Sequence, residues 1–237
     1  MTDAPDLPDT ASPHSTHAPV RAAADDAVGA AQLAAFLAAR MCHDFISPVS
    51  AIVSGLDLMD DPEAQDMRED ALGLVAASGR KLAQMLAFTR VAFGASASAE
   101  TFDPRELEAL TQGVFAHLRA DLDWRVEAHA VDKASARCLL NLAQLAGGAL
   151  PLGGKTSVRA VSDGATTSIA VEAAGPKARL RPEVAAGLKG ERLPEGLLHG
   201  QWVQAYYVSL FVREAGGRVL ADAAEEKITF AATLPKI

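Results

Sequence analysis

The chain has 237 residues, of which 49% are hydrophobic, 22% charged and 5% aromatic. This length fits one large domain or two modest ones, and the composition is typical of a globular, helix-rich protein. The formal net charge of −8 at pH 7 argues against nucleic acid or an anionic membrane surface as the principal partner, because both favour clustered Lys and Arg. We therefore expect protein partners.

The sequence shows few signs of export or membrane insertion. Residues 1–28 lack the apolar core and cleavage site of a secretory signal, and the richest apolar run, residues 33–39, is far shorter than the roughly 18–20 residues that cross a bilayer. With only two cysteines, a disulfide framework is not expected. We predict a soluble, cytoplasmic protein.

The first 28 residues contain four prolines and five aspartates with little that is large and apolar, which predicts a disordered tail. Residues 30–60 are Ala-rich with apolar side chains at helical spacing, which predicts one long helix. Its apolar stripe consists of Leu33, Leu37, Met41, Pro48, Ile52, Gly55/Leu56 and Met59.

A second helix is predicted over about 63–92, ending near Gly94. Asp61 is its candidate N-cap and Pro62 its first helical residue. The expected apolar stripe of this helix consists of Leu72, Val75, Leu82 and Leu86. Because a lone hairpin cannot cover such stripes, we expect residues 29–95 to dimerise into a four-helix bundle, with a linker at 95–99.

Residues 100–237 are predicted to form a second domain of the α+β class, with helices on a largely antiparallel sheet. The expected helices cover residues 103–120, 133–148 and 201–215. The expected strands cover residues 122–131, 157–161, 168–172, 218–222 and 227–234. The turn signal Ser162-Asp-Gly164 predicts a hairpin between the second and third of these strands.

His43 lies in the middle of the first predicted helix, on a face of small and polar residues. At 100° per residue its nearest neighbours on the helix surface include Phe36, Arg40, Ser47, Ser50 and Ser54. The apolar residues Met41, Pro48, Ile52 and Met59 fall on the opposite side. The pattern predicts that His43 points into solvent, with room for another protein to approach the ring.

His43 and Asp44 are the candidate catalytic residues. A neutral imidazole has a lone pair that can attack phosphorus, and a neighbouring carboxylate can orient the ring or accept its proton. Phosphoryl transfer asks mainly for positioning and charge neutralisation. Pro48 has no amide hydrogen for the carbonyl of Asp44, so we expect the helix to bend there.

The segment His43-Asp-Phe-Ile-Ser-Pro48 resembles the H-[ED]-x-x-x-P phospho-acceptor box of sensor histidine kinases, and the second domain resembles their ATP-binding domain. The nucleotide motifs are nevertheless altered. Leu145 replaces the second Asn of the N-box in Asn141-Leu-Ala-Gln-Leu-Ala146. The adenine box is reduced to Glu172-Ala-Ala-Gly-Pro176, and His199-Gly-Gln-Trp-Val-Gln204 replaces the later glycine-rich loop. Phosphates and Mg²⁺ thus have no obvious site.

A kinase-like chain with an intact phospho-acceptor and degenerate nucleotide motifs resembles the histidine phosphotransferases of phosphorelays. The resemblance implies that His43 is phosphorylated, that Asp44 assists, and that Arg40, Ser47, Ser50 and Ser54 help to dock receiver domains. It implies a homodimer with two kinds of partner: the receiver domain of a CckA-like hybrid kinase, and CtrA-like and CpdR-like response regulators. It also implies that this chain binds no cofactor or metal, with Mg²⁺ supplied by the receivers.

Two alternatives stay open at this stage: a divergent ATP-dependent sensor kinase, and a non-catalytic dimer that sequesters a regulator. Three further histidines, His117, His129 and His199, are interpreted as surface or structurally satisfied residues. Cys42 is interpreted as a partly buried packing residue. Residues 179–183 are expected to form a solvated loop, with contact to a receiver's acidic pocket as the alternative.

Overall fold

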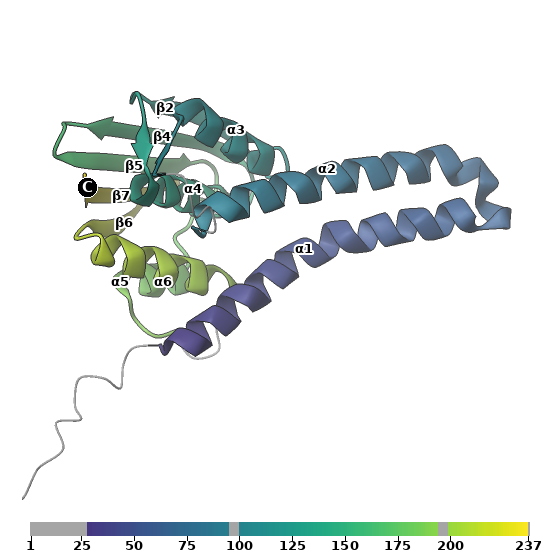
Figure 1. The fold of residues 1–237 in the computed structure, drawn as a ribbon, viewed down its shortest axis with the longest axis horizontal. Helices are drawn as coiled ribbons and strands as arrows, with labels where there is room; N and C mark the ends of the chain where they lie inside the picture. Colours follow the sequence, from purple (N-terminus) through teal and green to yellow (C-terminus); the bar gives the residue numbers. More distant parts are fainter. Residues whose placement is uncertain (1–27, 95–99, 194–198, 237) are drawn as a thin grey trace, which may run out of the picture.

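In the computed structural model, a long helical hairpin projects from an α+β unit (Figure 1). The structure describes residues 28–94, 100–193 and 199–236. The predicted tail therefore lies outside the described residues except for Val28, and so does the predicted linker at 95–99. The combination of a helical hairpin with a sheet domain confirms the predicted α+β class.

The hairpin consists of α1 (Ala30–Asp60) and α2 (Arg68–Ala92), joined by a short 3₁₀ helix, η1 (Pro62–Met67). The predicted cap is confirmed, because the Asp61 carboxylate accepts a hydrogen bond from the amide of Glu63 at 2.9 Å. The second helix begins later than predicted. Ala64 has non-helical backbone angles, so the first turns after Pro62 are 3₁₀ and the α-helix starts only at Arg68.

The hairpin covers more of its predicted apolar stripe than expected. Pro48 and Gly55 of α1 are buried, and a Cβ built on Gly55 would lie 2.6 Å from Val75 Cγ2. The structure describes a single chain, so the expected dimerisation into a four-helix bundle stays a prediction, although α2 already covers part of the stripe. On α2, by contrast, Leu72 and Leu86 are exposed, whereas Ala71 and Ser78 are buried.

A different apolar set on the hairpin stays exposed. On α1 it consists of Ile46, Val49, Val53 and Leu56, and on α2 it includes Leu72 and Leu86. The α1 residues follow one another at steps of three and four, which is the spacing of a coiled-coil seam. An apolar seam in this position fits a helix of another chain.

α1 has the length and composition of a helix that could cross a membrane, which the short apolar runs in the sequence did not indicate. Length and composition are weak evidence here, because α1 packs along α2 and also against the sheet unit. The helix is moreover amphipathic, since one face carries the polar residues around His43.

The sheet has five strands in the order β2-β4-β5-β7-β6. Their bounds are β2 Ala120–Val126, β4 Gly154–Ser162, β5 Thr166–Ala174, β6 Arg218–Ala224 and β7 Lys227–Pro235. β2 and β4 run parallel and the other pairs are antiparallel, which confirms the prediction of a largely antiparallel sheet with a hairpin between β4 and β5. A separate two-stranded ladder, β1 (Thr101–Phe102) with β3 (Val131–Asp132), was not predicted.

In the part of the chain that the structure describes, four helices accompany the sheet: α3 (Pro104–Phe115), α4 (Lys133–Gly148), α5 (Pro182–Lys189) and α6 (His199–Glu214). α4 lies at the centre of the core, where Leu139, Leu140 and Leu142 are fully buried. α5 corrects the expected loop at 179–183, because Arg181 is its N-cap and Pro182 its first residue. It packs against α6 at Gly187, where a Cβ would lie 2.7 Å from the carbonyl oxygen of Trp202.

The altered nucleotide motifs are part of this packing. Leu145, at the position of the missing Asn, is 4% exposed and belongs to the apolar core. Gly175, in the reduced adenine box, lies so close to Gly153 that an added Cβ would be 2.5 Å from its carbonyl oxygen. The lack of a side chain at Gly175 therefore allows two backbone segments to lie close together.

Candidate functional site

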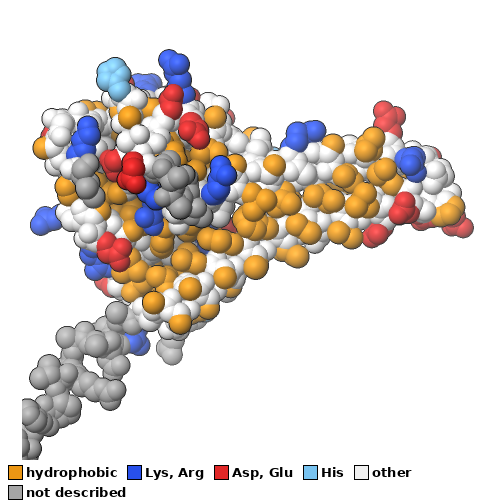
Figure 2. Space-filling model, in the orientation of Figure 1, with side chains coloured by type: hydrophobic (Ala, Val, Ile, Leu, Met, Phe, Trp, Pro, Cys, Tyr) orange, Lys and Arg blue, Asp and Glu red, His pale blue; other side chains and the backbone are white. Residues whose placement is uncertain are grey.

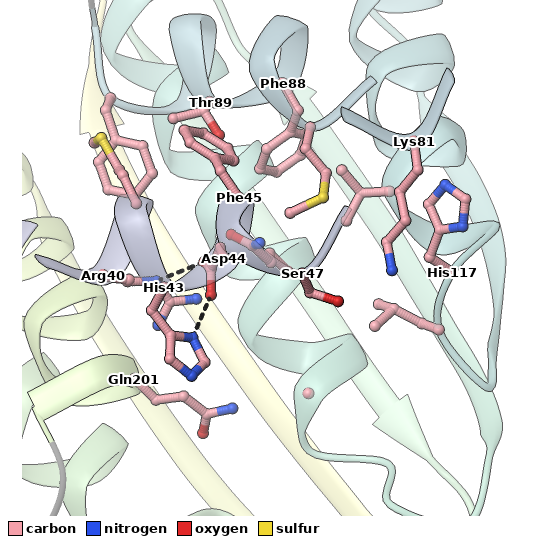
Figure 3. A pocket seen from close by; sticks show the side chains of 17 residues that line it. Arg40, His43, Asp44, Phe45, Ser47, Lys81, Phe88, Thr89, His117 and Gln201 are labelled. Atoms are coloured by element: carbon pink, nitrogen blue, oxygen red, sulfur yellow. Dashed lines mark hydrogen bonds and ion pairs between the residues drawn. The ribbon is translucent and has the colours of Figure 1, made fainter. Parts of the chain in front are cut away.

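His43 lies where α1 passes the N-terminal end of α6, and its side chain is 86% exposed (Figure 3). The predicted orientation toward solvent is therefore confirmed. Pro48 follows one turn later and is buried, and Figure 1 shows α1 bending along its length. The histidine is accessible, yet its neighbours belong to a packed part of the protein.

Three side chains form a connected polar group around the ring. His43 Nδ1 lies 3.3 Å from Asp44 Oδ1, and the other carboxylate oxygen lies 3.5 Å from Arg40 Nε. Arg40 also donates a hydrogen bond from its guanidinium to the carbonyl of Gly200, at 2.5 Å. A ring that donates from Nδ1 to Asp44 keeps its lone pair on Nε2.

The side chain of Arg40 extends from α1 toward α6 and does not lie on the exposed surface around His43. Its side chain is only 13% exposed, so the expected placement of Arg40 among the exposed residues around His43 is corrected. Burial lowers the pKa of the Arg40 guanidinium, and the charge of Asp44 opposes that shift. Arginine keeps its proton at neutral pH, so a buried cation stands beside Asp44.

The predicted serines do lie on the open face. Ser47, Ser50 and Ser54 are all exposed on α1 and extend from His43 toward the tip of the hairpin. Cys42 is also exposed, which corrects its interpretation as a partly buried packing residue. The surface beside His43 therefore consists of small side chains that leave the ring open to a partner.

Two cavities meet at His43. One, of about 330 Å³, is lined by residues of α1, α2, α3, α4 and α6, among them His43, Lys81, His117 and Gln201. The other, of about 430 Å³, lies between α1 and the first turn of α6 and includes Phe36, His199 and Gln201. Figure 3 shows Gln201 beside the His43 ring, with Lys81 and His117 on the far side of the first of these cavities.

Sequence reasoning missed Lys81, His117 and Gln201 as neighbours of the site. His117 Nε2 lies 3.0 Å from Gln84 Oε1, and its pKa is lowered by burial and, to a lesser extent, by the charge of Lys81. Lys81 comes from α2, His117 from the turn after α3 and Gln201 from α6, so no local motif connects them with His43. Of the three, only Gln201 lies in a segment that the sequence singled out, the altered glycine-rich loop at residues 199–204.

Among residues 28–94, 100–193 and 199–236 there is no group of three or more His, Cys, Asp or Glu side chains that could hold a metal ion. The His43 site itself offers one imidazole and one carboxylate, and Arg40 already engages that carboxylate. Such a donor set does not fit a resident metal.

The comparisons with known proteins agree with this geometry. Residues 104–227 match the family model for the histidine phosphotransferase C-terminal domain. The chain therefore belongs to the histidine phosphotransferase family, as its motifs predicted. It is 32% identical over 206 residues to the protein phosphotransferase ChpT of Brucella abortus (strain 2308), a match that covers 86% of this chain and 97% of that protein.

A solved structure described as a bacterial phosphotransferase has the same fold. It superposes with a TM-score of 0.76 at 31% identity, and the match covers 86% of this chain and 97% of that chain. The nucleotide-free catalytic domain of the histidine kinase ThkA matches at a TM-score of 0.46 and 18% identity, over 57% of this chain and 94% of that chain.

Proposed function

We propose that this protein is a phosphorelay intermediate that carries a phosphoryl group on His43 from one receiver domain to another without using ATP. The observation that carries the proposal is the exposed His43 ring, whose Nδ1 lies 3.3 Å from Asp44 in a chain of the histidine phosphotransferase family. The ring is reachable and oriented, which is most of what phosphoryl transfer requires of a protein acceptor.

In the proposed reaction, the Nε2 lone pair of His43 attacks the phosphorus of an aspartyl phosphate on the donor receiver. The N–P bond forms while the bond between phosphorus and the aspartate oxygen breaks, and the donor carboxylate leaves with the electron pair. Asp44 stabilises the positive charge that the ring acquires. In the second half, an aspartate of the acceptor receiver attacks the same phosphorus, and the imidazole leaves.

Independence from ATP is supported by the state of the nucleotide motifs. Leu145 provides a buried apolar side chain where the N-box pattern has an Asn that faces the metal and phosphates. The elements around it, α4, α5 and α6, share one apolar core. We propose that the Mg²⁺ used in transfer is bound by the receivers, since aspartyl phosphate chemistry takes place in their own acidic site.

The proposed docking surface consists of Ser47, Ser50 and Ser54, next to His43 and continuing along α1. Beside it runs the exposed apolar seam Ile46, Val49, Val53 and Leu56. Figure 2 shows hydrophobic side chains gathered along the hairpin. We propose that a second copy covers this seam in a four-helix bundle, which leaves the serine face for the receivers.

The proposed partners are the receiver domain of a CckA-like hybrid kinase as donor and CtrA-like and CpdR-like regulators as acceptors. A receiver interface of standard size buries about 800 Å² per partner, and we propose that it forms on the hairpin face and the adjoining end of α6. We propose that the relay operates in the cytoplasm, where response regulators act.

The test is a label-transfer assay with a ³²P-phosphorylated hybrid-kinase receiver, the full-length chain and a second receiver, each run with and without unlabelled ATP. We expect the chain to acquire label and pass it on in both conditions. His43→Ala should block both steps, whereas His129→Ala, an exposed histidine on the sheet unit, should leave them unchanged.

Each alternative predicts another outcome. Labelling of the chain by γ-³²P-ATP alone would indicate a sensor kinase. Binding of receivers without any label on the chain would indicate a sequestering module. Relay by His43→Ala at the wild-type rate would disprove the role of this residue.

A further inference from the structure

Arg40 has an environment that packing alone does not explain. Its side chain is 13% exposed and lies beside the first turn of α6, where the positive end of the helix dipole disfavours a cation. A buried guanidinium is costly unless it is paired and hydrogen-bonded. The polar contacts of Arg40 are therefore what keeps its charge tolerable at this position.

Arg40 contacts both α6 and the carboxylate beside the reactive histidine. On one side it donates to the carbonyl of Gly200 at 2.5 Å, and on the other it lies 3.5 Å from Asp44 Oδ2. Because Asp44 uses its second oxygen for His43 Nδ1, the three side chains form a continuous chain from α6 to the reactive ring (Figure 3). Both oxygens of Asp44 are thereby engaged.

The surrounding packing fixes the position of Arg40. One turn earlier on α1, the ring of Phe36 lies 4.3 Å from His199 and 5.9 Å from Trp202, measured between centroids. Trp202 is 1% exposed, so this contact reaches into the core of the α5–α6 unit. α1 is therefore held against α6 on the same face that presents Arg40 to Gly200.

We infer that Arg40 is a positioning residue through which α6 of the degenerate nucleotide domain holds Asp44, and thus the His43 ring, in the geometry for phosphoryl transfer. This inference rests on the proposed function. It gives the second domain a role that needs no nucleotide: its α6 is a fixed support for the phospho-acceptor. Without Arg40, Asp44 turns toward solvent and the ring loses its preference for one tautomer.

The experiment compares Arg40→Gln and Arg40→Lys with the wild-type chain, with Arg159→Gln as the control on an exposed position of β4. Gln keeps a donor for the Gly200 carbonyl but has no charge for Asp44, whereas Lys keeps the charge. The first readout is the ¹⁵N NMR tautomer ratio of His43 at mildly alkaline pH. The second is the initial rate of label uptake from a phosphorylated hybrid-kinase receiver.

For Arg40→Gln we expect a mixed tautomer population and uptake slowed by roughly tenfold, since a loosened reacting group loses orientation. Arg40→Lys should recover part of both, and Arg159→Gln should match wild type. A wild-type rate in Arg40→Gln, or a slower rate with an unchanged tautomer ratio, would overturn the inference. If the proposed relay is wrong, the wild-type chain will take up no label. The tautomer ratio of His43 is measured without any phosphoryl transfer, so it still decides the role of Arg40 in that case.

Discussion

The side-chain amide of Asn141 on α4 donates a hydrogen bond to the backbone carbonyl of Ala92, at the C-terminal end of α2. The distance is 2.7 Å, and the same amide also donates to the carbonyl of Arg137 at 2.8 Å. Its oxygen accepts from Gln204 of α6. The remaining Asn of the N-box pattern thus joins the end of the hairpin to two helices of the sheet unit.

Asn141→Asp should therefore destabilise the whole protein. Asn141 is 0% exposed, and the substitution removes both donors and turns a carboxylate toward two carbonyl oxygens. We expect a loss of about 3 kcal/mol or more in the free energy of unfolding, measured by urea denaturation. The same amide-to-acid change at exposed Gln32 should cost less than about 0.5 kcal/mol. Equal urea midpoints of unfolding for the two variants would contradict the stabilising role of the Asn141 hydrogen bonds.

Most of the fold could be predicted because its signals are local. The periodicity of residues 30–60, the Asp61-Pro62 start and the turn at Ser162-Asp-Gly164 each act within a few residues. α5 could not be predicted in this way. It has only eight residues, and its Gly187 is explained by close contact with Trp202 and Tyr206 of α6, which is a tertiary relationship.

The same distinction applies to the site. The exposure of His43 and its contact with Asp44 follow from positions on one helix, so sequence periodicity was enough to predict them. Arg40 shares that helical face, yet it is buried because Gly200, 160 residues further along the chain, lies against it. The positions of residues on one helix do not indicate a contact with a segment so far along the chain.

Gly55 of α1 lies in close contact with α2, and this contact predicts the sign of the stability change on substitution. A Cβ there would lie 2.6 Å from Val75 Cγ2 and 3.1 Å from the Ala71 carbonyl oxygen. Gly55→Ala gains up to about 1 kcal/mol of helix propensity but overpacks a β-branched side chain and a backbone atom. We expect a net loss of roughly 1 to 2 kcal/mol in thermal or urea unfolding.

Gly73→Ala is the matched control, because Gly73 lies on α2 with nothing within 4 Å of a built Cβ. Here only the helix propensity changes, so we expect stabilisation by up to about 1 kcal/mol. If both variants shifted stability in the same direction, the close contact at Gly55 would not be the cause.

The exposed seam on α1 predicts how the oligomer can be broken. Val53 is 51% exposed in the single chain and would lie inside the proposed four-helix bundle. Val53→Glu would bury two unpaired carboxylates per dimer, which is strongly unfavourable. We expect wild type to sediment as a dimer and the variant as a monomer. Ala77→Glu, on an exposed position of α2 away from the seam, should keep the wild-type mass, and a dimeric Val53→Glu would exclude this seam as the interface.

Lys81 and His117 line the cavity of about 330 Å³ beside His43, and the effect of the Lys81 charge on the His117 ring can be measured by titration. Burial first and the charge of Lys81 second lower the pKa of His117 from 6.5. Removing the cation in Lys81→Met should raise this pKa, though not fully, because the effect of burial persists. The measurement is the NMR titration of the His117 ring, with Arg80→Met, the neighbouring exposed cation, as control.

The sign of the stability effect follows from the same shift. Because the folded pKa of His117 lies below its unfolded value, the neutral ring favours the fold at higher pH. That contribution is lost as the pH falls from about 6.5 through the folded pKa. Lys81→Met should reduce the free energy of unfolding that is lost on acidification, because it brings the folded pKa of His117 closer to its unfolded value. Arg80→Met should leave this loss unchanged. An unchanged His117 titration in Lys81→Met would show that the two side chains do not interact across the cavity.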